Sequence, residues 1–328
     1  MRTGQVGWYG WLLVGLLGVA TCLDAGRVQA AEAKQTPKEA KVSTFIAMIN
    51  SESGHVFDNY ARYSKLIADL EKGPTCKELD LQRAVSGMGP SAPERYAGYK
   101  KALVKGPKLE VDAAAQEMLS AAEALFKPEN EASEYYFKNE YRKDSCKRGT
   151  EFNAVLVPNW VRYMKADREM RAFLDKYTDE RDTAELTKSE KKYGKALHYY
   201  HSKLMMSAKR LIRIANKEPF DAAEVRKQLE AFEPDIGEAQ ALAKKAGEKD
   251  KRTADAIYQG GYSQLLSRCD RFRDTLKEIL RVVDEEAKDP KAAKTMPNRR
   301  KNSMESMVTA YNGLVDQSNS TMYSKSMK

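Results

Sequence analysis

The sequence is poor in the side chains and short motifs that mark most enzyme active sites. Its 328 residues include three histidines, which leaves little for acid–base chemistry near neutral pH. A glycine-rich phosphate loop, a G-x-S-x-G elbow, an H-E-x-x-H zinc motif and a C-x-x-C-H haem motif are all missing from it. Nothing therefore indicates a nucleotide-dependent enzyme, a serine hydrolase, a zinc peptidase or a haem protein. We expect a protein that has no catalytic activity and carries no cofactor.

Glycine and alternating sequence patterns are also scarce. The chain has 19 glycines, and charged residues make up 31% of it. No window alternates apolar and polar residues for long enough to predict a sheet. Because a highly charged, glycine-poor composition suits long solvated helices, the sequence favours an all-α fold.

The positive charge of the chain is not concentrated in one stretch. The sequence has 56 lysines and arginines against 47 acidic residues, which gives a formal net charge of +9. Because the basic residues are spread among many acids, the composition gives no specific indication of nucleic acid. It favours attraction to anionic surfaces such as phospholipid head groups, cell-wall polymers or acidic proteins.

The first thirty residues have the pattern of a secretory signal peptide. Arg2 precedes an uncharged stretch, and Val28 and Ala30 supply small residues at positions −3 and −1 of a cleavage site. An uncleaved anchor is the alternative, but five glycines interrupt the stretch, which barely reaches the roughly 20 apolar residues of a spanning helix. We expect cleavage near Ala30 and a periplasmic or otherwise extracytoplasmic protein. Residues 31–40 are then expected to be a disordered linker, and residues 41–328 a single helical domain.

Cys22 raises the alternative of a lipid anchor. Bacterial lipoproteins carry a small residue just before the modified cysteine, whereas this chain has Thr21 there. We therefore expect simple cleavage rather than lipidation. Cleavage near Ala30 removes Cys22 and leaves the mature protein without a membrane tether.

Apolar residues spaced by four and three predict long helices with heptad-like seams. Three such seams are present, and the first, which is also the longest, consists of Val42, Ile46, Ile49, Ser53, Val56, Tyr60, Tyr63, Ile67 and Leu70. The second runs from Tyr193 to Ile214 and the third from Met304 to Met322. Ser91 is predicted to cap a helix that extends toward Leu103, and the prolines at 128, 219, 234, 290 and 297 are predicted to lie at joints. The expected architecture is an elongated antiparallel bundle of long helices.

Three cysteines remain after residue 30. Cys76 and Cys146 lie in patterns typical of loops between helices, whereas Cys269 lies in a helical pattern. An exported protein meets an oxidising compartment, so a disulfide between Cys76 and Cys146 is predicted, with two free thiols as the alternative. Cys269 is predicted to pack as a small apolar side chain.

One constellation of side chains is typical of a metal site. His198, His201 and Met205 are spaced three and four apart and so share one stripe of a helix. Imidazole and thioether ligands together suit copper, which favours a periplasmic copper-binding function as an alternative. The simpler interpretation is that these side chains only flank the second seam, because two histidines and a methionine often occur together on one helix by chance.

Two further patterns allow a functional interpretation beside a structural one. Glu52 and His55 have the Glu-x-x-His spacing of di-iron bundles, but a second such pair is missing. Tyrosines are abundant in the middle of the chain, where packing at helix interfaces is the default explanation. A groove that binds a sugar or an amine is the alternative for these tyrosines.

Several stretches spread over the chain form a recognisable set. They are Phe45-Ile46, Tyr135-Tyr136, Tyr141-Arg142-Lys143-Asp144, Asp179-Glu180-Arg181, Leu197-His198-Tyr199-Tyr200-His201, Leu204-Met205-Met206 and Ala310-Tyr311-Asn312-Gly313-Leu314-Val315. This set resembles the YiiG-type proteins, a bacterial envelope family of unknown function whose members are often lipoproteins. The resemblance implies an extracytoplasmic helical domain and brings no catalytic residues. The threonine before Cys22 departs from the family's lipidation pattern.

Together these patterns predict an exported, non-enzymatic helical protein that binds or scaffolds a component of the cell envelope. The expected partner is an envelope protein or an anionic surface, and the sequence does not identify it. The alternative is periplasmic copper binding through His198, His201 and Met205.

Overall fold

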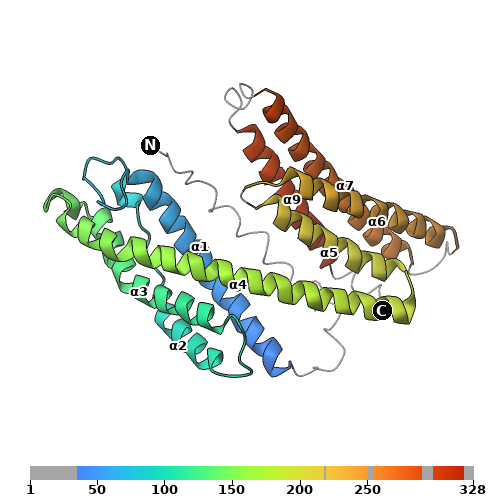
Figure 1. Ribbon diagram of the computed structural model, residues 1–328, viewed down its shortest axis with the longest axis horizontal. Helices are drawn as coiled ribbons and strands as arrows, with labels where there is room; N and C mark the ends of the chain where they lie inside the picture. The colour runs from blue at the N-terminus through green and yellow to red at the C-terminus, as the bar shows by residue number, and fades with distance from the viewer. Residues whose placement is uncertain (1–34, 218, 250–254, 290–297, 321–328) are drawn as a thin grey trace. The chain divides into compact units, whose positions relative to one another are not determined.

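The structure is a computed structural model that describes residues 35–217, 219–249, 255–289 and 298–320. These residues form helices joined by loops, and the described ranges contain no β-strand (Figure 1). The all-α fold predicted from the sequence is therefore confirmed. The expected signal peptide, residues 1–30, and Cys22 within it lie outside the described residues.

The described helices divide into two compact units, each with its own cluster of buried apolar side chains. Unit 1 comprises the described residues up to Tyr177, and unit 2 comprises those from Thr178 onward. The sequence predicted one helical domain over residues 41–328. The division between the two units lies inside helix α4 (Lys147–Tyr193), where no loop or change in composition marks it.

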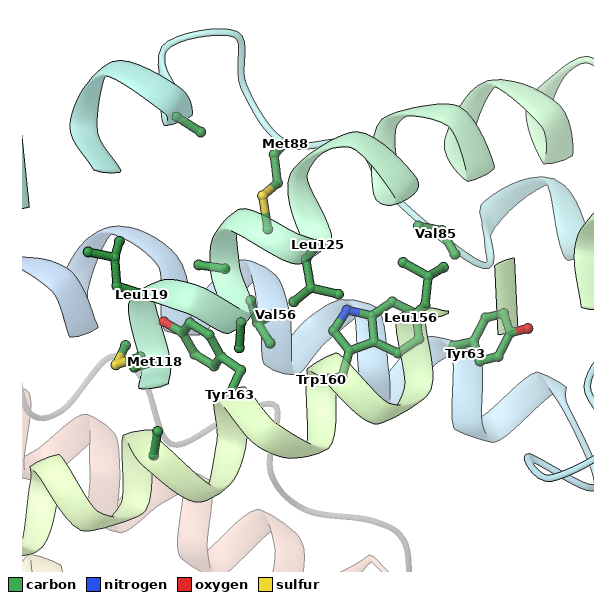
Figure 2. Close-up of a cluster of buried hydrophobic side chains, with 14 of the residues drawn as sticks. Val56, Tyr63, Val85, Met88, Met118, Leu119, Leu125, Leu156, Trp160 and Tyr163 are labelled. Atoms are coloured by element: carbon green, nitrogen blue, oxygen red, sulfur yellow. The ribbon is translucent and has the colours of Figure 1, made fainter. Parts of the chain in front are cut away.

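Unit 1 is built around the indole ring of Trp160. The ring is fully buried among apolar side chains of several elements, including Leu125 and Tyr63, whose ring centroid lies 5.3 Å from that of Trp160 (Figure 2). Helix α2 packs against α3, and α1 contacts both. The elements of unit 1 are α1 (Pro37–Leu66), η1 (Leu81–Arg83), α2 (Ala92–Leu103), α3 (Asp112–Phe137), η2 (Glu140–Arg142) and the first part of α4.

The first predicted seam forms much of the buried face of α1 as far as Tyr63, but α1 ends at Leu66, so Ile67 and Leu70 lie beyond the helix. Val42, Ile49, Val56 and Tyr63 are all buried, and Ser53 is buried among them. Because these positions recur every three or four residues, they lie along one side of the helix and face the core. The seam therefore positions the polar side chains of α1 that are described below.

Helix α1 begins earlier than expected. The side chain of Thr36 accepts a hydrogen bond from the backbone N–H of Glu39, and the Glu39 carboxylate accepts one from the backbone N–H of Thr36. This reciprocal capping box, followed by Pro37 at the first helical position, starts the helix. Residues 37–40 are thus helical, which corrects the expectation of a disordered linker over residues 31–40 for that part.

Two prolines that were expected at joints lie inside helices. Pro128 lies within α3 and Pro234 within α6. A proline costs a helix one backbone hydrogen bond, but here the helix continues because the residues on both sides are buried. Leu125 and Ala132 flank Pro128 in the core of unit 1. The helix thus gains more from burying both flanks than it loses at the proline.

Unit 2 is a second set of packed helices. Helix α7 packs against α6 and α9, and α5 packs against α6. The rings of Phe232, Phe272 and Tyr311 meet in its core. In the part of the chain that the structure describes, no helix combines the length and apolar character needed to cross a membrane. The helices of unit 2, besides the end of α4, are α5 (Leu197–Ala215), α6 (Ala222–Lys249), α7 (Asp255–Lys288) and α9 (Arg299–Ser318).

Candidate functional site

The predicted metal stripe lies on α5, where His201 and Met205 are buried in unit 2 and His198 is half-buried. His201 is 6% exposed, and its Nε2 atom lies 2.7 Å from the Oγ atom of Ser318 on α9. Burial, together with the neighbouring His198, lowers the pKa of His201 to about 4. Burial also lowers the pKa of His198, and Met205 is part of the buried apolar cluster. A buried, neutral and hydrogen-bonded His201 is typical of a structural histidine.

Within the described ranges, no three or more His, Cys, Asp or Glu side chains gather so that they could hold a metal ion. The third histidine, His55, belongs to unit 1 and lies beside Glu129. Copper binding through His198, His201 and Met205 therefore stays a prediction to which the geometry adds no support.

Glu52 and His55, the pair with di-iron spacing, contact different partners. The Oε1 atom of Glu52 accepts hydrogen bonds from Arg95, with the shorter one, from Nη2, at 2.6 Å. Its Oε2 atom accepts a hydrogen bond from the hydroxyl of Tyr96 at 3.2 Å. Next to this carboxylate, and because of its own burial, Tyr96 has a pKa well above its usual value. Glu52 is thus committed to a buried ion pair with α2.

Glu129 forms the most deeply buried polar centre of unit 1. Its side chain is 0% exposed, the Nε1 atom of Trp160 donates a hydrogen bond to Oε1 at 2.6 Å, and Nε2 of His55 lies 2.7 Å from Oε2. This carboxylate joins α1, α3 and α4 in the middle of the core. An acidic side chain at such a position is retained only where partners of this kind compensate for its loss of hydration.

Asp167, on α4, forms a third polar centre, which contacts α1 through Ser53. The hydroxyl of Ser53 donates a hydrogen bond to Oδ1 of Asp167 at 2.6 Å, and Nε of Arg171 donates one to Oδ2 at 2.6 Å. The hydroxyl of Tyr163 lies 3.1 Å from that of Ser53, and burial raises the pKa of Tyr163 well above its usual value. These groups hold α1 against α4.

On α1, the three centres involve a polar stripe of Glu52, Ser53 and His55, with Asn59 one turn further on. The carboxylates of the three centres each accept a hydrogen bond from a partner side chain. A network of this kind fixes the register between helices. The sequence analysis singled out Glu52 and His55 but missed Glu129 and Asp167. Glu129 could have been found, because it continues the buried four-and-three spacing of Leu125 and Ala132 in α3.

A disulfide lies at the end of unit 1 where α3 stops and α4 starts. Cys76 and Cys146 are bonded, and their Cα atoms are 5.7 Å apart, within the usual range for a disulfide. These are the two cysteines that the sequence pattern placed in loops. Cys269 is a free, buried cysteine in α7, where burial raises the pKa of its thiol.

The tyrosines near the disulfide pack as core residues. Tyr135 and Tyr136 are buried, and their rings make an edge-to-face contact with centroids 5.1 Å apart. The hydroxyl of Tyr135 donates a hydrogen bond to Asp144 at 2.7 Å. In unit 2, Tyr199 and Tyr200 make a similar contact. The geometry favours the packing interpretation of these side chains over a groove for a sugar or an amine.

Comparison with known proteins places the chain in a family. Residues 36–320 match the model of a family described as "Protein of unknown function (DUF3829)". The chain is also 27% identical over 219 residues to "Uncharacterized protein YiiG" of Escherichia coli (strain K12). That alignment covers 66% of this chain and 60% of the relative's length. Since the family model spans both units, the chain belongs to the DUF3829 family of proteins of unknown function.

Proposed function

We propose that this protein is exported and acts, without catalysis of its own, by binding or scaffolding a component of the cell envelope. The observation that carries the proposal is the state of the cysteines. Cys76 and Cys146 form a disulfide, and Cys269 is buried. Disulfides persist in oxidising compartments and are rare in the cytosol of most organisms. The signal-peptide pattern of residues 1–30 supports the same location independently.

The absence of catalysis is supported by how the described acids and histidines are used. Glu52, Glu129 and Asp167 are engaged by donors inside unit 1, and His201 is hydrogen-bonded to Ser318. A catalytic acid or base needs access to a substrate in addition to a suitable pKa. These buried groups have structural partners instead.

Export is tested by the mass and thiol state of the protein in its host. The full chain is produced with a C-terminal tag, cells are fractionated, and the mature mass is measured. We expect a periplasmic protein that starts at Ala31 and in which only Cys269 reacts with a thiol reagent after unfolding. Replacement of both Val28 and Ala30 by leucine is expected to block processing. A cytoplasmic chain with four free thiols and an intact N-terminus would refute the proposal.

Lipidation is separated from simple cleavage by one matched variant. Cys22→Ala leaves the Val28 and Ala30 positions intact, so we expect the same mature mass and the same fraction as for the wild type. A lipoprotein would instead begin at Cys22, and the variant would lose its membrane association. Radiolabelled palmitate provides a direct measurement of the same point.

Binding is tested with the processed chain, residues 31–328, which keeps every residue that the structure describes. The protein is immobilised and exposed to separated envelope fractions and to purified cell-wall polymer. Retention of a defined envelope component supports the proposal. A turnover of any envelope substrate that is lost on substitution of a single side chain would contradict the non-enzymatic part of it.

Copper binding through the α5 stripe is the alternative function. Its direct test is metal analysis of the protein purified from the periplasm, with the double variant His198→Ala/His201→Ala as the comparison. We expect no stoichiometric metal in the wild type. Copper at one equivalent in the wild type, lost in the double variant, would favour the alternative.

A further inference from the structure

The disulfide end of unit 1 carries a compact surface formed by two loops. We call it the disulfide tip and define it as residues 75–83 and 137–148. The bond between Cys76 and Cys146 joins the two stretches, and Nε2 of Gln82 donates a hydrogen bond to Oδ1 of Asn139 at 2.6 Å. The two stretches, although about 60 residues apart in sequence, thus form one continuous piece of surface.

Each stretch of the disulfide tip presents one large apolar side chain to solvent. Leu79 is 84% exposed and Phe137 is 74% exposed. Phe137 follows the buried pair Tyr135 and Tyr136 at the end of α3, so the helix turns its ring away from the core. Single exposed apolar residues are common, but here two of the most exposed ones share one loop pair. Among the described residues only Val104, at the end of α2, is comparably exposed.

The exposed side chains of the disulfide tip are more strongly basic than the composition of its two stretches indicates. The two stretches contain seven basic and four acidic residues. The basic side chains are all exposed, whereas among the acidic ones Asp80 is exposed and the partly exposed Glu140 lies 3.8 Å from Arg148. Glu78 accepts hydrogen bonds from Thr75, and Asp144 accepts them from Tyr135 and the Arg148 backbone. The basic residues are Lys77, Arg83, Lys138, Arg142, Lys143, Lys147 and Arg148.

We propose that the disulfide tip docks this protein on an anionic phospholipid surface, with Phe137 and Leu79 entering the head-group region and the basic side chains contacting lipid phosphates. The proposal deepens the proposed function, on which it rests, by naming the envelope component. Basic side chains combined with a few apolar ones are the pattern by which peripheral proteins bind at the bilayer interface.

A protein partner fits this surface less well. Protein–protein interfaces have a contiguous apolar centre and are depleted of lysine there. On the disulfide tip, Leu79 lies between Glu78 and Asp80 and Phe137 is the last residue of α3, while the exposed basic residues are spread over both stretches. A lipid head-group layer requires no complementary pocket and favours such exposed basic residues. The positions of the two apolar side chains are also constrained, because the disulfide and the Gln82–Asn139 hydrogen bond link the two stretches that carry them.

The test measures how the processed chain, residues 31–328, co-sediments with vesicles. One set contains phosphatidylcholine alone, and the other contains phosphatidylcholine with one third phosphatidylglycerol. We expect binding to the anionic vesicles at low salt, little binding to the neutral ones, and weakening as salt is raised because exposed charges are screened. Removal of residues 1–30 ensures that the signal segment does not bind lipid in its place.

Two variants separate the apolar from the electrostatic contribution. Leu79→Ser/Phe137→Ser removes exposed apolar surface only, and we expect about tenfold weaker binding to anionic vesicles. Arg142→Gln/Lys143→Gln/Lys147→Gln removes three positive charges, and we expect about a hundredfold weaker binding, since each basic residue near an anionic surface contributes about fivefold. Because the substituted side chains are exposed, far-ultraviolet spectra should match the wild type.

The opposite end of unit 1 supplies matched controls. Val104→Ser removes an equally exposed apolar side chain, and Lys101→Gln/Lys105→Gln/Lys108→Gln removes three exposed charges. We expect both controls to bind like the wild type. Equal losses of vesicle binding in the controls and in the tip variants would show that binding does not depend on the disulfide tip and would overturn the proposal.

The remaining outcomes also decide the question. Absence of binding to anionic vesicles overturns it, and if the tip variants then lose an envelope protein in the retention experiment, the occupant is that protein. The vesicle assay does not depend on export, so its failure leaves the localisation experiment unaffected. Conversely, a cytoplasmic protein that still binds anionic vesicles through the tip would refute export alone.

Discussion

The two units are both packed helices, yet they are held together in different ways. Unit 1 has a disulfide, a core rich in tyrosine, and seven of the buried polar residues among the described side chains. Unit 2 has a free buried cysteine and four buried polar residues. Unit 1 thus has a covalent link and more buried polar groups, whereas unit 2 has no disulfide among its described residues.

This difference teaches that similar helical units of one chain need not respond alike to the same stress. Reduction and loss of a hydrogen-bond partner should affect unit 1, while acid should affect unit 2 through His201. After removal of residues 1–30, Trp160 is the only tryptophan of the chain. Its fluorescence therefore reports the unfolding of unit 1, and the remaining change in helical content reports unit 2.

The largest expected effect is loss of the disulfide. For Cys76→Ala/Cys146→Ala we expect the free energy of unfolding of unit 1 to fall by about 4 kcal/mol, because the bond closes a loop with a sequence separation of 70 residues. The Trp160 transition in urea should move to lower concentration while the unit 2 transition stays. Cys269→Ala is the mirror control and should shift unit 2 alone. A joint shift of both transitions would show that the units unfold as one.

The next effect concerns Glu129. For Glu129→Ala we expect the free energy of unfolding of unit 1 to fall by about 3 kcal/mol, because the buried N–H of Trp160 loses its acceptor. Glu129→Gln retains an acceptor oxygen and should cost less than half as much. The measurement is again the urea transition seen by Trp160. Equal losses for the two variants would mean that the negative charge, rather than the hydrogen bond, stabilises the core.

A pH effect on unit 2 is expected from His201. Its pKa falls from 6.5 to about 4 on folding, so the unfolded state binds the proton more readily between these values. Stability of unit 2 is therefore complete above pH 6.5 and is lost as the pH falls toward 4, by about 3 kcal/mol for a shift of this size. His198 acts in the same direction, since burial lowers its pKa too.

His201→Gln isolates this pH effect. The amide can still hydrogen-bond to Ser318 but does not titrate, so the dependence of the unit 2 transition on pH between 6.5 and 4.5 should become flatter. The Trp160 transition of unit 1 serves as the internal reference in the same sample. A wild-type unit 2 that is equally stable at pH 7 and pH 5 would contradict the prediction.

The smallest expected effect is at the start of α1. For Thr36→Ala we expect the free energy of unfolding of unit 1 to fall by about 1 kcal/mol, because the capping box with Glu39 is lost. Thr44→Ala, two turns into the same helix, removes only a hydroxyl bonded to the carbonyl of Ala40 and should change stability by less than about 0.5 kcal/mol. Thermal unfolding followed by Trp160 fluorescence compares the two.

The helical architecture was predictable because it depends on local spacing. Val42, Ile49, Val56 and Tyr63 recur at helical intervals, and they are indeed the buried side of α1. The predicted cap of α2 shows the limit of such reasoning. Ser91 does precede the helix, but its hydroxyl accepts a hydrogen bond from Arg95 and makes no cap. A capping motif shows that a side chain is able to cap a helix, but a neighbouring donor such as Arg95 can take up that side chain instead.

The features that were not predicted depend on contacts between distant parts of the chain. Whether Pro128 breaks α3 depends on how much its flanks bury, and the environment of Glu129 depends on His55 and Trp160 from two other helices. His201 was expected at the edge of the seam, and only its contact with Ser318, 117 residues away, explains why it is buried. The surface formed by Leu79 and Phe137 likewise exists only once the two loops meet.

If the protein is exported, as we propose, the disulfide also has a consequence for the order of bond formation. In a chain that crosses a membrane from its N-terminus, Cys76 emerges first, Cys146 second and Cys269 last. An oxidase that pairs thiols in the order of their arrival would therefore join Cys76 to Cys146 before Cys269 is accessible. The correct bond would then form at the first attempt, without a disulfide isomerase, and the third thiol would be enclosed as unit 2 folds.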